Sequence, residues 1–195
     1  MSEEAKQDRV ARWEKRVEEA PESAPAHFNL GLAHTERGRM MAAEKAYRRA
    51  VELDPDLVQA WVNLGGALLM KWDFQASLEA NREAVRRKDD LVEAHYNMGQ
   101  AYLYLKNADQ LVQCNRRVLE LEGKHPAAHY FLAVGLLSTD QVEEARAECS
   151  RAASLGYQPR AEFLKSLDRA EKALVQNDTT GASPEAEADG NAKEE

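Results

Sequence analysis

The stretch HFNLGLAH at residues 27–34 decides the fold, because the same frame returns three more times along the chain. It reads WVNLGGAL at 61–68, HYNMGQAY at 95–102 and HYFLAVGL at 129–136. Successive frames are 34 residues apart. Periods of about 20 to 50 residues mark repeat architectures, in which each unit buries its apolar face by stacking on its neighbours. The chain is therefore predicted to be one structural unit repeated.

Alignment on this frame divides the central part of the chain into four contiguous units without insertions. The units span 24–57, 58–91, 92–125 and 126–159. In the first unit, apolar residues at helical spacing occur in two runs, separated by the polar break ERGR around Gly38. Asp54 ends the second run, because the following Pro55 disfavours helix in the residue before it. Each unit is therefore expected to be two helices joined by a tight turn.

An amphipathic segment precedes the four units. Residues 3–20 place Val10, Trp13 and Val17 on one stripe of a helix, and the break PESAP follows them. Residues 1–23 are therefore expected to form a partial repeat that caps the first unit.

Two further segments follow the units. Residues 160–176 carry apolar residues at helical spacing with polar residues between them, and are expected to form the C-terminal capping helix that such arrays require. Residues 177–195 contain no large apolar residue, and hold six acidic residues against one lysine. This composition predicts a disordered acidic tail.

Composition limits the class of function. The chain has 195 residues and a formal net charge of -8, which argues against a general nucleic-acid binder because a chain of this sign repels phosphates. No segment approaches the roughly 20 apolar residues that span a bilayer, and the charged start MSEEAKQDRV lacks the apolar stretch of a secretory signal. We therefore expect a cytoplasmic protein without membrane insertion. Cys114 and Cys149 lie in different units and form no CxxC, which predicts free thiols.

The units resemble tetratricopeptide repeats, whose motif places an aromatic residue, Leu-Gly and a second aromatic residue on the first helix, and Ala, an aromatic residue, Ala and Pro on the second. The matching residues are Leu30, Gly31, Ala43, Tyr47, Ala50 and Pro55 in the first unit and Trp61, Leu64, Gly65 and Ala84 in the second. Departures in later units include Asn81 and Asn115 in the place of Tyr47. The resemblance covers residues 24–159 and implies an all-α fold, a right-handed α-solenoid of helix-turn-helix repeats with capping helices at both ends.

No motif for catalysis appears, since the chain lacks GxSxG, a Walker loop and a dinucleotide fingerprint. His125 and His129 have the i, i+4 spacing of metal ligands. Pro126 is expected to leave His125 outside the helix, however, and no third ligand follows, whereas zinc needs three or four. One repeat position explains His27, His95 and His129, since they share it with Trp61. The sequence predicts no enzyme, no cofactor and no metal site.

In a tetratricopeptide array the first helices of successive units line a concave groove, so the resemblance implies a peptide-binding surface there. Peptide-binding members of the family hold the backbone of an extended peptide with an asparagine ladder. The equivalent column here holds Asn29, Asn63 and Asn97, and then Phe131. A side-chain amide offers donors and an acceptor, and so matches a peptide unit whatever its side chains. Asn is also common at this place without a known ligand, which leaves both interpretations open.

Neighbouring columns predict an apolar groove, with an aromatic strip of the kind that marks interaction sites. The predicted contacts are Phe28, Val62, Tyr96, Tyr104, Tyr130 and Phe131. Leu69, Leu103 and Leu137 are equally compatible with burial between helices. Trp72 occupies the turn position that Gly38 holds in the first unit, and serves either an edge interface or local packing.

The resemblance does not extend to the carboxylate clamp that grips the acidic C-termini of chaperones. Its basic places hold Phe28, Val62, Glu93, Ala127 and Phe131. A basic row runs along the second helices, at Arg48, Arg49, Arg82, Arg86, Arg87, Lys88, Arg116 and Arg117. It attracts an acidic partner or the acidic tail unless the interleaved glutamates neutralise it.

The sequence therefore favours a non-enzymatic adaptor or scaffold for protein–protein interaction, whose groove binds a peptide or an amphipathic helix of a partner. One alternative is self-assembly into an oligomeric scaffold, through the array or through its Trp13 and Trp72 edges. Another is a chaperone or assembly factor for a larger complex.

Overall fold

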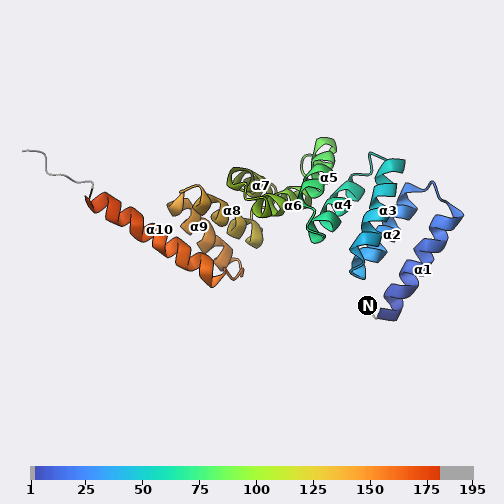
Figure 1. The fold of residues 1–195 in the computed structure, drawn as a ribbon, viewed down its shortest axis with the longest axis horizontal. Helices are drawn as coiled ribbons and strands as arrows, with labels where there is room; N and C mark the ends of the chain where they lie inside the picture. Colours follow the sequence, from blue (N-terminus) through green and yellow to red (C-terminus); the bar gives the residue numbers. More distant parts are fainter. Residues whose placement is uncertain (1–2, 181–195) are drawn as a thin grey trace, which may run out of the picture.

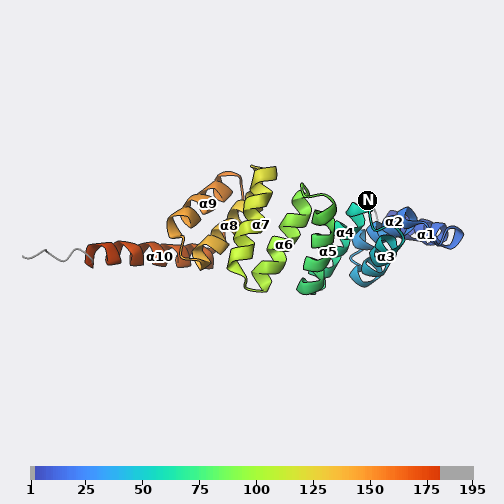
Figure 2. The ribbon, with the colours of Figure 1, turned by 90° about the horizontal axis from the view of Figure 1, so that it is seen from above.

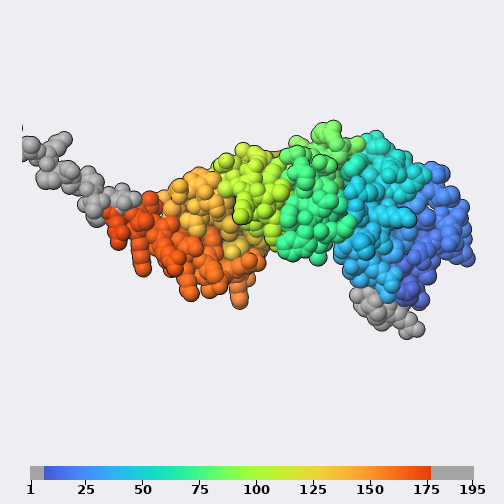
Figure 3. Space-filling view, in the orientation of Figure 1, coloured from blue at the N-terminus to red at the C-terminus, as the bar shows by residue number. Residues whose placement is uncertain are grey.

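The computed structural model describes residues 3–180, and these form ten α-helices and no strand. The helices are α1 (Glu3–Glu19), α2 (Ala24–Glu36), α3 (Met40–Leu53), α4 (Val58–Met70), α5 (Phe74–Arg87), α6 (Val92–Tyr104), α7 (Ala108–Leu121), α8 (Pro126–Ser138), α9 (Val142–Ser154) and α10 (Ala161–Thr180). Figures 1 and 2 show them stacked in a row from α1 at one end to α10 at the other. The space-filling view in Figure 3 shows one elongated body that bends into an arc. This is the α-solenoid that the sequence predicts.

The 34-residue step is visible in where the helices begin. The first helices of the four units begin at Ala24, Val58, Val92 and Pro126, and the second helices at Met40, Phe74, Ala108 and Val142. Each pair is joined by a turn whose middle residue has a positive φ, namely 68° at Gly38, 64° at Trp72, 56° at Lys106 and 59° at Asp140. Trp72 therefore occupies the turn position predicted from Gly38. No helix between residues 3 and 180 has the length and hydropathy needed to traverse a lipid bilayer.

Local signals begin and end the helices where the sequence indicates. Ser23 precedes α2 and its Oγ accepts a hydrogen bond from the N–H of Ala26 at 3.3 Å. Pro126 begins α8, and His125 lies outside that helix as predicted, where its Nδ1 accepts from the N–H of Ala128 at 3.1 Å. Asp54 closes α3 in an extended conformation. These caps satisfy backbone groups that the helix itself leaves unpaired.

The glycine column marks the place where the two helices of each hairpin approach most closely. A Cβ at Gly31 would lie 2.4 Å from Cε1 of Tyr47, one at Gly65 2.1 Å from Nδ2 of Asn81, and one at Gly99 3.0 Å from Nδ2 of Asn115. The first two distances are shorter than those that real Cβ atoms show to their neighbours. Glycine is therefore required by the size of the side chain that faces it.

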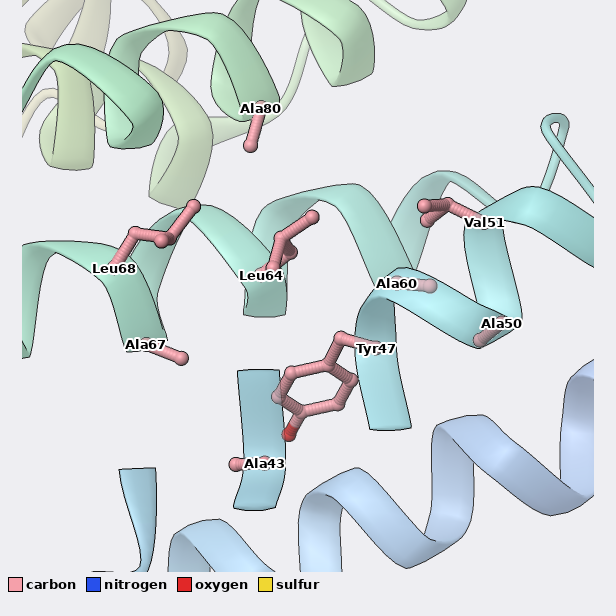
Figure 4. Packing of buried hydrophobic residues seen from close by; sticks show 9 residues of the cluster. All are labelled: Ala43, Tyr47, Ala50, Val51, Ala60, Leu64, Ala67, Leu68 and Ala80. Atoms are coloured by element: carbon pink, nitrogen blue, oxygen red, sulfur yellow. The ribbon is translucent and has the colours of Figure 1, made fainter. Parts of the chain in front are cut away.

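The apolar core follows the row of helices as a series of clusters. Figure 4 shows the first, in which the buried Tyr47 of α3 belongs to one cluster with Leu64 and Leu68 of α4. The next joins units two and three around Leu78, and a third joins unit four to α10 around the fully buried Leu167. The array therefore has no single centre, and each unit is stabilised by its neighbours.

The two end helices dock on the array through apolar stripes. In α1, Val10 is buried, and Trp13 and Val17 are half-buried. Helix α10 begins close to the predicted position but continues to Thr180, so residues 177–180 are helical and the predicted tail boundary at 176 is too early. The rest of the predicted acidic tail, 181–195, lies outside the described residues.

Candidate peptide-binding groove and aromatic edge

A hollow of about 530 Å³ lies over the first helices α2, α4 and α6. We call it the groove hollow. Among its lining residues are Val62, Asn63, Gly66, Met70, Glu93 and Asn97. Apolar walls with a few polar groups are the usual composition of a ligand site. Glu93 is the one charged side chain on the lining, so the hollow is nearly neutral.

The three predicted asparagines are held in two different ways. Asn29 and Asn63 each donate to a carbonyl oxygen four residues earlier in their own helix, that of Pro25 at 2.7 Å and that of Gln59 at 2.8 Å. The Oδ1 atoms of these two side chains accept no hydrogen bond from the described part of the chain. Asn63 lines the groove hollow, whereas Asn29 lies outside it.

Asn97 also lines the groove hollow, but its side chain is partly committed within the protein. Its Nδ2 donates to Oδ1 of the buried Asn81 at 3.4 Å. This bond links units two and three. Asn63 therefore has the most freedom of the three to meet a ligand inside the hollow.

The predicted apolar contacts do not form one strip. Val62 lines the groove hollow, while Phe28 packs on Tyr47 with ring centroids 6.0 Å apart. Tyr96 and Phe131 lie 6.2 Å apart by their centroids, and both are half-buried. Burial raises the pKa of the Tyr96 phenol, with a further contribution from Tyr157. The predicted residues thus divide between the hollow, the first unit and an aromatic group near the C-terminal end.

The prediction of Tyr130 as an open groove contact needs correction, because its side chain is only 4% exposed. Its ring stacks on Tyr157 with centroids 4.7 Å apart and meets the edge of Phe163 at 5.3 Å. Phe163 belongs to α10, which covers the last unit. The 34-residue period carries no information about the capping helix α10. The repeat column of Tyr130 therefore suggested an exposed residue.

A third group of predicted residues lies at the turns between paired helices. The indole of Trp72 meets the ring of Tyr104 at a centroid distance of 5.2 Å and that of Phe74 at 5.8 Å, both nearly perpendicular. Phe74 and Tyr104 stack at 4.6 Å with planes 3° apart. The exposed Met70 and Leu105 flank these rings in the sequence. We call these five residues the aromatic edge.

Sequence reasoning selected Trp72 and Tyr104 but missed Phe74. A signal was available, because the equivalent position holds Met40, Ala108 and Val142 in the other units. Leu69 and Leu103 pack against the core around Leu78, and Leu137 packs against the C-terminal core. These three leucines are therefore structural.

Three of the five histidines, His27, His95 and His129, are explained by a repeat position that they share with Trp61. A ring nitrogen lies near a carbonyl oxygen at the end of the preceding unit in all four cases: His27 to Pro21 at 2.8 Å, Trp61 to Pro55 at 2.8 Å, His95 to Asp89 at 2.8 Å and His129 to Gly123 at 3.3 Å. His129 also meets Oε2 of the buried Glu148 at 2.5 Å through Nδ1. Among residues 3–180, no three His, Cys, Asp or Glu side chains are grouped so as to hold a metal ion.

The basic row is engaged within the protein. Arg49 pairs with Glu22 at 2.9 Å and with Glu52 at 3.3 Å, and Arg116 pairs with Glu144 at 2.9 Å. The other members contact Glu44, Glu83, Asp56, Asp89, Asp90, Glu120 and the Tyr102 hydroxyl. Interleaved acids therefore neutralise most of this face, and Arg82 is the member whose partner among the described residues is a hydroxyl instead of an acid.

Both cysteines are free and buried, as predicted. Burial raises the pKa of Cys114 to about 11, the nearby Arg82 opposing this weakly. A thiol with so high a pKa is a poor nucleophile.

Solved structures with this arrangement of helices are numerous. One is PilF of Pseudomonas aeruginosa, 22% identical, with a TM-score of 0.74 over 91% of this chain and 81% of that one. Another is MamA from Desulfovibrio magneticus RS-1, 15% identical, with a TM-score of 0.72 over 77% of this chain and 85% of that one. A third is YrrB, described as a TPR protein with an unusual peptide-binding site, 17% identical, with a TM-score of 0.68 over 86% of this chain and 97% of that one. At these identities the likeness concerns the fold.

No curated protein sequence matches the chain. Family models do match it, and both are described as a tetratricopeptide repeat. One covers residues 24–57 and the other residues 92–125, the first and third units. Together with the ten-helix solenoid, these matches establish that the chain is a tetratricopeptide repeat protein.

Proposed function

We propose that the chain is a non-enzymatic adaptor that holds an extended segment of a partner protein in the groove hollow. The observation that carries this proposal is the pairing of apolar walls with an amide whose oxygen is unused. Val62 and Met70 offer apolar surface, and Oδ1 of Asn63 accepts no hydrogen bond from the described chain. An extended peptide has N–H groups that need such an acceptor.

The charge of the hollow limits which partner segments can bind there. Glu93 occupies a place where a carboxylate clamp needs a base, so an acidic segment meets repulsion here. A neutral or weakly basic segment with apolar side chains fits better. The peptide-binding site described for YrrB, which has the same fold, supports a peptide as the occupant.

The test uses random dodecapeptides displayed on phage, selected on the full chain and then synthesised for fluorescence anisotropy. Gly66 lines the hollow, and a Cβ there meets only Asn97 Nδ2 at an ordinary contact distance of 3.7 Å. Gly66→Gln therefore fills the hollow without a backbone clash. We expect it to weaken peptide binding by about tenfold or more, the equivalent of about 1.4 kcal/mol.

Two further variants separate the loss of the Asn63 amide from the filling of the hollow. Asn63→Ala removes the amide alone and is expected to weaken binding by about fivefold. Gly66→Ala adds only a methyl group and serves as the matched control, with an effect of less than about twofold. Selected peptides that bind the Gly66→Gln protein as tightly as the original would contradict the proposal. A further expectation is weak salt dependence, because the lining is nearly uncharged.

A further inference from the structure

The residues of the aromatic edge differ from those at the same positions of the other units, and the hairpin does not require this difference. The place of Trp72 is taken by Gly38, Lys106 and Asp140 in the other units, and that of Tyr104 by Glu36, Met70 and Ser138. All four units form the same turn between their helices. The turn itself therefore does not require aromatic residues at these places.

Trp72 is also held in an unfavourable conformation. Its φ of 64° lies in the left-handed region, which a bulky residue rarely adopts. The side chain is nevertheless 68% exposed, so burial does not compensate for the strain. Strained and exposed groups of this kind concentrate at functional sites.

The rings form a surface suited to a rigid anchor. Phe74 is half-buried and its ring stacks parallel to that of Tyr104, which is 49% exposed. Trp72 stands nearly perpendicular to both rings. Large aromatic side chains with few rotatable bonds provide contact area at low entropic cost and are enriched among interface hot spots.

The aromatic edge is continuous with the groove hollow. Met70 lines the hollow, is 65% exposed, and lies two residues before Trp72. A segment that leaves the hollow past Met70 therefore meets the rings next. In the adjoining turns, Lys71 is paired with Glu44, whereas Lys106 makes no ion pair with any described residue.

We propose that the aromatic edge anchors one end of the same partner segment that occupies the groove hollow, an inference that rests on the proposed function. The anchoring residue is a proline or an aromatic residue that stacks on Trp72 and Tyr104. A carboxylate close to it in the partner pairs with Lys106. The partner segment is thus apolar and uncharged in the hollow, and acidic at the end that crosses the edge.

The decisive variant is Trp72→Gly, which copies the first unit at Gly38 and relieves the positive φ. It is expected to keep or raise the midpoint of thermal unfolding, so any loss of binding is not a loss of fold. Dodecapeptides selected on the original chain are expected to lose about tenfold in affinity. Tyr104→Ser, which copies Ser138, is expected to act in the same direction. Met41→Ala is the matched control, because Met41 is 78% exposed and lies outside both surfaces.

The charge requirement is tested separately with Lys106→Gln. It is expected to weaken binding by about threefold at low salt, and the difference should vanish at high salt because exposed pairs are screened. Equal binding of both proteins at low salt contradicts the role of Lys106. Enriched peptides should carry a proline or aromatic residue near an acidic one, and enrichment without that pairing contradicts the proposed partner chemistry.

The outcomes distinguish this inference from the proposed function. If Gly66→Gln abolishes binding and Trp72→Gly leaves it unchanged, the inference is wrong and the groove proposal stands. If Trp72→Gly abolishes binding and Gly66→Gln does not, the edge is an independent site and both proposals fail. Sedimentation equilibrium adds a third outcome: a dimer of the original chain that Trp72→Gly converts to monomer shows that the rings cover a second copy, which overturns the inference.

Discussion

The first three units and the fourth build the same helical hairpin from different pairs of side chains. In units one to three a glycine faces a larger residue, as Gly65 faces Asn81. In unit four the same two places hold Ala133 and Cys149, both buried in the C-terminal core. A larger residue on one helix accompanies a smaller one on the other. The comparison teaches that the hairpin depends on how well the two facing residues fit each other, and less on which residues make the pair.

The same boundary changes the groove face from amides to aromatic rings. Asn81 in unit two accepts a hydrogen bond from Asn97 in unit three at 3.4 Å. Asn115 occupies the equivalent place one unit later, but Phe131 stands where its partner amide would be. Oδ1 of Asn115 is consequently buried without a hydrogen bond. The bond between amides therefore joins units two and three, and at unit four aromatic contacts of Phe131 with Tyr96 and Tyr130 take its place.

The largest expected effect concerns the cap that completes unit four. Leu167 on α10 is 0% exposed within the C-terminal core, and Leu167→Ala is expected to lower the free energy of unfolding by about 3 kcal/mol. Urea denaturation followed by circular dichroism measures it. The exposed Lys165 on the same helix is the control, and Lys165→Ala should change stability by less than about 0.5 kcal/mol. A loss below about 1 kcal/mol for Leu167→Ala would show that unit four holds together without α10.

The next effect tests directly how the two facing residues of a hairpin fit each other. Gly65→Ala is expected to cost about 2 kcal/mol, because its Cβ would lie 2.1 Å from Nδ2 of Asn81. The double change Gly65→Ala with Asn81→Cys copies the pair of unit four and should recover most of that loss. Gly66→Ala, one residue away, has room and should raise stability by about 0.5 to 1 kcal/mol. A double variant no more stable than Gly65→Ala alone would show that the fit of this pair does not govern the hairpin.

A smaller effect is the difference in stability expected when each of the two buried asparagines is replaced. Asn81→Ala breaks the bond from Asn97 and a 2.8 Å bond to the carbonyl of Ser77. Asn115→Ala breaks a 2.9 Å bond to the carbonyl of Leu111 but also removes the unpaired Oδ1. We expect Asn81→Ala to be the more destabilising by about 1 kcal/mol. Thermal and urea unfolding of the two variants side by side decide this, and equal losses would mean that the orphaned oxygen carries no penalty.

The smallest effect concerns His34 in unit one, at a place that holds Leu68, Tyr102 and Leu136 in the other units. Its Nδ1 is buried without a hydrogen bond, so His34→Leu is expected to stabilise the protein by about 0.5 kcal/mol at pH 7.5. Burial lowers the pKa of His34 below its ordinary 6.5, although Glu14 opposes this and Arg39 and Arg37 reinforce it.

The pH dependence of this variant has a definite sign. The unfolded chain binds the His34 proton more readily than the folded chain, so the stability that neutral His34 provides is present above pH 6.5 and is lost as pH falls through the folded pKa. The advantage of His34→Leu should therefore grow from pH 7.5 to pH 5 in urea denaturation. An advantage that shrinks at acid pH would contradict the lowered pKa.

Much of the fold was predictable, because its signals are local. The glycine column, the prolines and the apolar spacing act within one helix or one turn. They place the hairpins, the position of His125 outside its helix and the turn position of Trp72. The histidine column was predictable for the same reason. The candidate site was less so. Asn63, Asn97 and Val62 do line the groove hollow, whereas Tyr130 is buried and Phe74 was missed.

The sequence by itself determined that this protein is a stack of helical hairpins, since the period, the turn residues and the helix ends each depend on neighbours a few residues away. Only the tertiary structure decided which column residues stay open. Phe163 reaches Tyr130 from the end cap, Tyr104 reaches Trp72 from the next unit, and Asn97 reaches Asn81 across a unit boundary. Such contacts depend on the sizes and charges of side chains in two different units. The period indicates that the units stack. It does not indicate how a residue that differs from the repeat packs against the neighbouring unit.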